Sequence, residues 1–91
     1  MSHKVLVTGA AGFIGSSVVT TLSEQGWNVV GADALLDGLY PATEKVSRFD
    51  KLGELPGVET FRLDLRSDDL NALPSDITHV INEAAMPGLG L

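Results

Sequence analysis

The chain of 91 residues contains no cysteine. This absence excludes disulfide bonds, thiolate catalysis and cysteine-ligated metal sites together, and it fits a reducing compartment. Because residues 1–4 also lead into a strand without a signal-peptide pattern, we expect a cytoplasmic location. Its two histidines, His3 and His79, have no further ligand at metal-binding spacing, so no metal site is expected.

Basic residues and long apolar runs are also scarce. Six Lys and Arg stand against 12 Asp and Glu, and without a basic stripe we expect no nucleic-acid partner. The apolar stretches are far too short to span a bilayer, and residues 1–4 enter a strand without a signal-peptide core, so no membrane partner is expected. Hydrophobic residues make up 44% of the chain, which is typical of a globular protein, and the length allows one domain at most.

The chain does contain three regularly spaced glycines, Gly9, Gly12 and Gly15, directly after a β-branched apolar run. A helical pattern follows them, with apolar residues on one expected packing face: Phe13, Ile14, Val18 and Leu22. Glycines between a strand and a helix allow a sharp turn, and they let backbone N–H groups approach a pyrophosphate. This segment predicts a dinucleotide site.

Strand and helix patterns alternate along the rest of the chain. This alternation predicts an α/β fold, namely a partial Rossmann-type doubly wound parallel sheet of about four strands with covering helices. The expected strands are 4–8, 28–33, 58–63 or 58–65, and 78–82, and the expected helices are 12–25, 41–52 and a short one between 67 and 74.

Asp33 ends the second expected strand, near the offset of about 20 residues at which a carboxylate accepts hydrogen bonds from the adenosine ribose. It favours NAD over NADP, because a 2′-phosphate would face a like charge. The alternative is a solvated loop acid. Lys45 and Arg48 fall within the second helical pattern, and we interpret both as part of a solvated helix face.

Two later strand ends carry further candidates. Asp64 follows the third strand at the carboxyl edge of the sheet, where it is placed either to accept from an adenine amino group or to cap a loop. Ala84 and Ala85 follow the fourth strand, and such small residues suit either a flat ligand lying against the backbone or simple packing.

Taken together, these segments resemble the N-terminal half of the extended short-chain dehydrogenase/reductase family, the NAD-dependent epimerases and dehydratases of nucleotide sugars. The match covers nearly the whole chain, and residues 39–52 more weakly resemble UDP-glucuronate 4-epimerases and their relatives. The residues that carry the family match are the TGAAGFIG segment 8–15, Asp33, Asp64 with Leu65, and Asn82 to Ala85.

The resemblance implies specific contacts. It places the amides of Phe13 and Ile14 on the pyrophosphate of NAD, Asp64 and Leu65 at the adenine, and Ala84 and Ala85 at the nicotinamide. A nucleotide sugar is the substrate of the full-length family. Asn82 and Glu83 replace a more usual His-Leu pair, and Ala34 stands where many members have an Asn that contacts the ribose.

The family's catalytic Tyr-x-x-x-Lys pattern is missing. The single tyrosine, Tyr40, is followed four positions later by Glu44, so the resemblance implies no catalytic residue in this chain. We expect residues 1–91 to be the N-terminal part of an NAD-binding domain, without the catalytic and substrate-binding region and without turnover of its own. Its outer strand is expected to favour self-association. The alternatives are a stand-alone dinucleotide-binding regulatory module and an NAD(P)-dependent reductase of the same superfamily.

Overall fold

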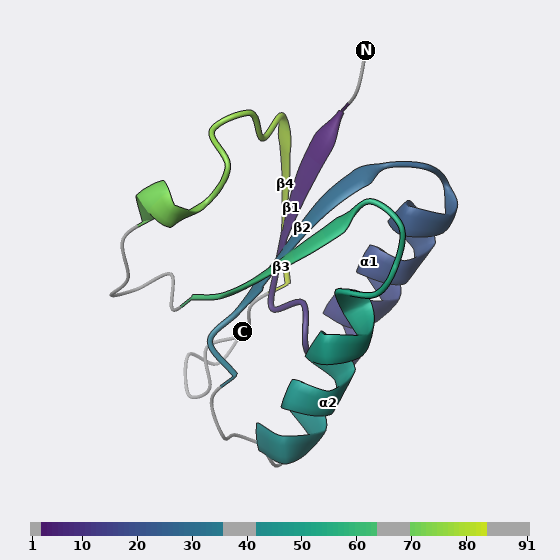
Figure 1. Ribbon diagram of the computed structural model, residues 1–91, viewed down its shortest axis with the longest axis vertical. Coiled ribbons are helices and arrows are strands. Elements are labelled where there is room, and N and C mark those ends of the chain that lie inside the picture. Colours follow the sequence, from purple (N-terminus) through teal and green to yellow (C-terminus); the bar gives the residue numbers. More distant parts are fainter. Residues whose placement is uncertain (1–2, 36–41, 64–69, 84–91) are drawn as a thin grey trace.

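The computed structural model describes residues 3–35, 42–63 and 70–83, and it arranges four strands into one parallel sheet in the order β3-β2-β1-β4 (Figure 1). This is a partial Rossmann-type α/β fold, as the sequence predicts. The strands are β1 (Lys4–Thr8), β2 (Asn28–Asp33), β3 (Val58–Arg62) and β4 (His79–Asn82). The helices are α1 (Phe13–Glu24), α2 (Ala42–Leu52) and the 3-10 turn η1 (Leu70–Ala72).

The two central strands explain why the apolar runs are continuous. β1 pairs with β2 on one edge and with β4 on the other, and residues from the rest of the chain pack against it on both faces of the sheet. Val5 and Val7 face α1 and α2 and are nearly fully buried, whereas Leu6 faces the opposite side. The first two strands have the bounds that the sequence predicts, while the third ends at Arg62 and the fourth begins at His79.

Both longer helices lie on one face of the sheet (Figure 1). The expected packing face of α1 is partly wrong: its buried residues are Gly15 and Val19, and Val18 and Leu22 are only partly buried against the core. Phe13 and Ile14 are 54% and 68% exposed. The reason is positional, because the first turn of α1 starts at the carboxyl edge of the sheet and has no strand beneath it.

The opposite face is covered by the segment that contains η1 (Figure 1). Leu73 and Ile77 from this segment pack against Leu6 and Val30, together with Phe61 of β3. The short helix that the sequence predicts is reduced to η1 among described residues, since 64–69 lie outside them. In the described part of the chain, no helix has the length and apolar character needed to cross a membrane.

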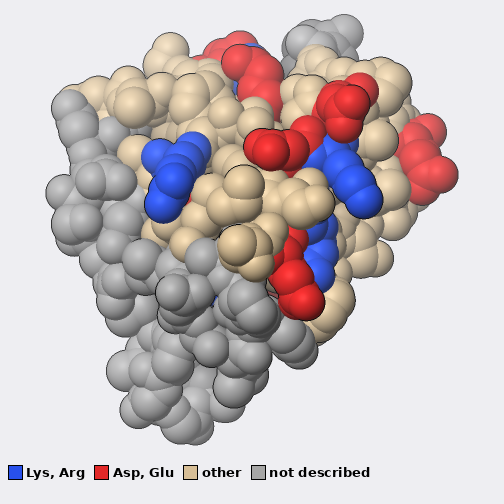
Figure 2. Space-filling view, turned by 60° about the horizontal axis from the view of Figure 1, so that its bottom comes forward, with Lys and Arg blue, Asp and Glu red and all other residues tan. Residues whose placement is uncertain are grey.

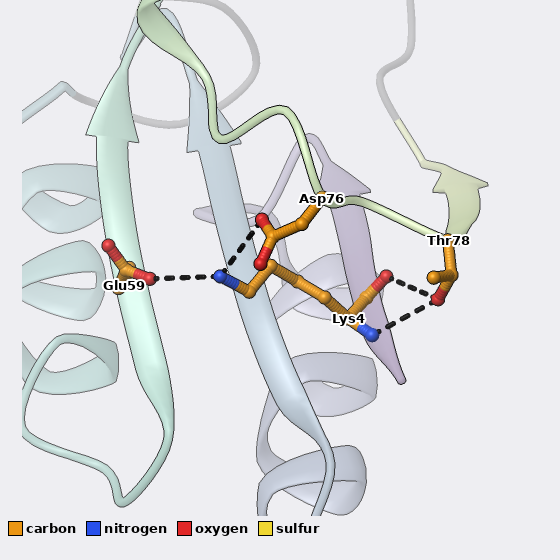
Figure 3. A network of polar contacts seen from close by, with 4 residues as sticks. All are labelled: Lys4, Glu59, Asp76 and Thr78. Atoms are coloured by element: carbon orange, nitrogen blue, oxygen red, sulfur yellow. Dashed lines mark hydrogen bonds and ion pairs between the residues drawn. The ribbon is translucent and has the colours of Figure 1, made fainter. Parts of the chain in front are cut away.

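Lys4 ties together three parts of the amino edge of the sheet (Figure 3). Its ammonium group lies 3.7 Å from a Glu59 carboxylate oxygen on β3 and 3.2 Å from one of Asp76. Its backbone N–H donates to Thr78 Oγ1 over 3.1 Å, and the Thr78 N–H donates to the Lys4 carbonyl over 2.8 Å. These contacts fix how β4 joins β1, at the end of the sheet away from the glycines.

Candidate functional site

The glycine segment forms a tight turn between β1 and α1. Gly9 has a φ of 67°, in the left-handed region that favours glycine. Its carbonyl accepts a hydrogen bond from the Gly12 N–H over 3.1 Å, and the Ser16 N–H then donates to the Gly12 carbonyl over 2.9 Å. The chain therefore passes from strand to helix within a few residues, as the spacing predicts.

Gly12 and Gly15 lack a side chain for different reasons. A Cβ at Gly15 would lie 2.1 Å from the Gly9 carbonyl oxygen, so the close approach of α1 to the turn requires glycine there. A Cβ at Gly12 would meet that same oxygen at 3.4 Å, an ordinary contact. Packing within the chain thus explains Gly15, whereas a Cβ at Gly12 would meet no second atom of the described residues within 4 Å.

The N-terminus of α1 is suited to an anion. Gly12 is the N-cap residue, its helix has no side-chain cap hydrogen bond, and no acidic residue occurs in the first turn. The first N–H groups of a helix point along its axis and carry a partial positive charge. The first turn, with Phe13 and Ile14, is exposed at the edge of the sheet and contributes no carboxylate of its own.

The structure brings Asp33 to this turn from the end of β2. One carboxylate oxygen, Oδ2, accepts from the Ala11 N–H over 2.9 Å, and Oδ1 accepts from the Leu35 N–H over 2.7 Å. Parallel pairing of β1 with β2 continues into the turn, where the Ala10 N–H donates to the Ala32 carbonyl over 3.2 Å. A carboxylate oxygen has two lone pairs, so each can still accept from a hydroxyl group. The three glycines and Asp33 thus share one edge of the sheet.

Arg48 also reaches the turn, which the sequence interpretation of a solvated helix face did not anticipate. From α2, its Nη1 donates to the Ala11 carbonyl, and its Cζ lies 4.3 Å from the centre of the Phe13 ring. The side chain is only half-buried. The hydrogen bond to Ala11 joins residues 37 positions apart, and no local pattern in the sequence indicates that pairing.

The carboxyl ends of β1 and β4 meet beside the glycine turn. Thr8 is 3% exposed, and its hydroxyl donates to the side-chain oxygen of Asn82. The Glu83 N–H donates to the Thr8 carbonyl over 3.1 Å. The helix that links β1 to β2 packs on one face of the sheet, and Leu73 and Ile77, which precede β4, pack on the other, so the connections change face between β1 and β4. Such a switch point is where ligands bind in open α/β sheets.

Four of the candidates from the sequence, Asp64, Leu65, Ala84 and Ala85, lie outside the described residues. Figure 2 turns the carboxyl edge towards the viewer and shows acidic and basic side chains interspersed over the part of this face that is described. Within residues 3–35, 42–63 and 70–83, no group of three or more His, Cys, Asp or Glu is arranged to hold a metal ion.

Known proteins are similar to this chain in both sequence and fold. The model of the NAD dependent epimerase/dehydratase family matches residues 5–90. A UDP-glucose 4-epimerase of Pisum sativum is 36% identical over 92 residues, covering 98% of this chain and 26% of the relative. UDP-glucuronate 4-epimerase 1 of Arabidopsis thaliana is 36% identical over 89 residues, covering 94% of this chain and 20% of the relative.

A solved structure of an epimerase is also similar to this chain. The UDP-glucuronic acid 4-epimerase of Bacillus cereus in complex with NAD superposes with a TM-score of 0.81 at 41% identity, covering 96% of this chain and 28% of that one. The chain thus spans between a fifth and about 28% of the length of these proteins. With the family model matching nearly its whole length, the chain belongs to the NAD dependent epimerase/dehydratase family.

Proposed function

We propose that this chain binds NAD at the turn between β1 and α1, as the N-terminal part of the cofactor domain of a nucleotide-sugar epimerase or dehydratase. In this proposal the turn admits the pyrophosphate to the amides of Phe13 and Ile14, and Asp33 accepts from the adenosine ribose. The assignments of adenine to Asp64 and Leu65, and of nicotinamide to Ala84 and Ala85, rest on the family resemblance. A cytoplasmic location remains part of the proposal.

The observation that carries the proposal is the hydrogen bond from the Ala11 N–H to Asp33 Oδ2, at 2.9 Å. It joins the anion-accepting end of α1 and the carboxylate at the end of β2 within one ligand-sized region. A dinucleotide needs donors for its phosphates and an acceptor for its ribose diol, and this edge of the sheet offers the two side by side. The single contact that a Cβ at Gly12 would make with the described residues supports the same interpretation.

The substrate class is inferred from the relatives, whose names include UDP-glucose and UDP-glucuronate 4-epimerases. Bound NAD would supply a hydride acceptor, while the chain's own residues bind and orient the adenosine half. The sequence contains no Tyr-x-x-x-Lys pattern for removing a hydroxyl proton, so we propose that residues 1–91 bind cofactor without turnover. NAD-dependent epimerisation of a UDP-sugar by this polypeptide alone would contradict that part.

Calorimetric titration with NAD and NADP tests the cofactor assignment. We expect the unmodified chain to prefer NAD, and Asp33→Ala to weaken NAD binding by about ten-fold or more, since hydrogen bonds to a charged group contribute about 1.5–3 kcal/mol. Asp50→Asn is the matched control, because it removes one carboxylate from the exposed side of α2. Equal affinity for both cofactors, unchanged in Asp33→Ala, would remove Asp33 from the site.

A further inference from the structure

Arg48 holds the backbone of the glycine turn from a separate helix. Its Nη1 donates to the Ala11 carbonyl, while Asp33 accepts from the N–H of the same residue. Ala11 is fully buried. Its carbonyl is held by Arg48 of α2 and its N–H by Asp33 of β2, so both backbone polar groups bond to charged side chains. The Ala11 carbonyl shares a rigid peptide plane with the Gly12 N–H, so fixing one fixes the other.

The charge of Arg48 lies at an electrostatically unusual position. Its guanidinium group stacks at 4.3 Å on the ring of Phe13, the first residue of α1. A cation next to the positive end of a helix dipole is unfavourable, and cations are normally favoured at the opposite end. The Asp33 carboxylate on the N–H of Ala11 supplies one negative charge nearby, and an anion bound at this helix start would add a second that interacts favourably with both the dipole and the guanidinium.

We propose that Arg48 is a positioning residue of the dinucleotide site, which fixes the peptide between Ala11 and Gly12 and adds a positive charge beside the bound pyrophosphate. The inference rests on the proposed NAD site and extends it to α2. It also assigns a role to the Phe13 side chain, which is more than half exposed yet forms the surface on which the guanidinium lies.

Three variants of the 91-residue chain separate the contributions of the Arg48 charge, its planar guanidinium group and the Phe13 ring to NAD binding. Arg48→Gln removes the charge and the planar fork, Arg48→Lys keeps the charge alone, and Phe13→Leu removes the stacking ring. The control is Lys51→Gln, which removes the same charge from an exposed position one turn further along α2. Each is titrated with NAD by calorimetry at low and at high salt, after circular dichroism has established its fold.

We expect NAD affinity to fall about ten-fold in Arg48→Gln and about three-fold in both Arg48→Lys and Phe13→Leu, with no change in Lys51→Gln. The salt dependence of the dissociation constant should weaken in Arg48→Gln alone, because only that variant loses a charge beside the ligand. The double variant of Arg48→Gln with Phe13→Leu should bind no more weakly than Arg48→Gln, since the two side chains act as one unit.

Two results would overturn this inference while the NAD site stands: wild-type affinity in Arg48→Gln, or equal losses of affinity in Arg48→Gln and Lys51→Gln. If Arg48→Gln does not fold, Arg48→Lys and Phe13→Leu decide, and wild-type affinity in both refutes the role. Absence of NAD binding by the unmodified chain would overturn the proposed function and this inference together.

Discussion

Substituting Gly15 with alanine should destabilise the fold, whereas the same change at Gly12 should act on ligand binding. At Gly15 the new Cβ would lie 2.1 Å from the Gly9 carbonyl oxygen, 2.8 Å from its carbonyl carbon and 3.1 Å from the Ala10 Cα. All three atoms belong to the backbone of the turn, so none can rotate away as the end of a side chain could. The helix must move away from the turn or the turn must deform.

Two opposing effects set the change in the free energy of unfolding that we expect for Gly15→Ala. Overpacking in a close-packed site costs about 1–3 kcal/mol, and the 2.1 Å overlap with backbone places Gly15→Ala at the upper end. Alanine regains about 1 kcal/mol of helix propensity over glycine. We therefore expect a net loss of about 2 kcal/mol, which lowers the melting temperature of so small a domain by roughly 8–16 °C.

Gly12→Ala is the matched control for the same assay. Its Cβ makes a 3.4 Å contact, and its backbone angles of φ −74° and ψ 170° are open to alanine. Exchanging an N-cap glycine for alanine should cost no more than about 1 kcal/mol. Urea and thermal unfolding measure both variants, and calorimetry should show that folded Gly12→Ala loses NAD affinity. A Gly15→Ala chain as stable as Gly12→Ala would refute the reasoning from close approach.

Two further outcomes can be measured on the same chain. Lys4→Met should lower the free energy of unfolding by less than about 1 kcal/mol, because Glu59 and Asp76 have side chains 58% and 67% exposed and solvent screens both pairs. A loss above about 2 kcal/mol in urea titration, undiminished by salt, would contradict this. Val80 is 62% exposed on β4, so Val80→Lys should reduce self-association of the chain in light scattering. A wild-type chain that stays monomeric at high concentration counts against the predicted association.

Local patterns in the sequence predict most of the fold. Continuous apolar residues indicate β1 and β2 with their observed bounds, and the spacing of Gly9, Gly12 and Gly15 indicates the turn between strand and helix. These features depend on neighbours in the chain, so a single sequence is enough to identify them. The number of residues between the glycines and Asp33 is a local feature of the same kind, because the length of one strand-helix-strand unit fixes it.

Contacts between distant elements were not predictable in the same way. Arg48 reaches the turn because α2 packs beside α1, and the side chain of Lys4 on β1 pairs with Glu59 of β3 and with Asp76, which follows η1. Helical periodicity also assigned Phe13 to the packing face. Periodicity gives the direction of a side chain around the helix axis, but it does not tell where along that axis the supporting sheet ends.

The order of strands in the sheet has a consequence for how the chain is made. Of the four strands, β1 is synthesised before the others, yet its partner β4 begins only after Thr78, which contacts Lys4 across 74 positions. At about 5–20 residues per second, synthesis of that interval takes roughly 4–15 s. Strand pairing needs only microseconds, so β1 presents a bare edge to neighbouring nascent chains for nearly all of this time. The rate of translation across the interval is therefore expected to control how much newly made protein aggregates.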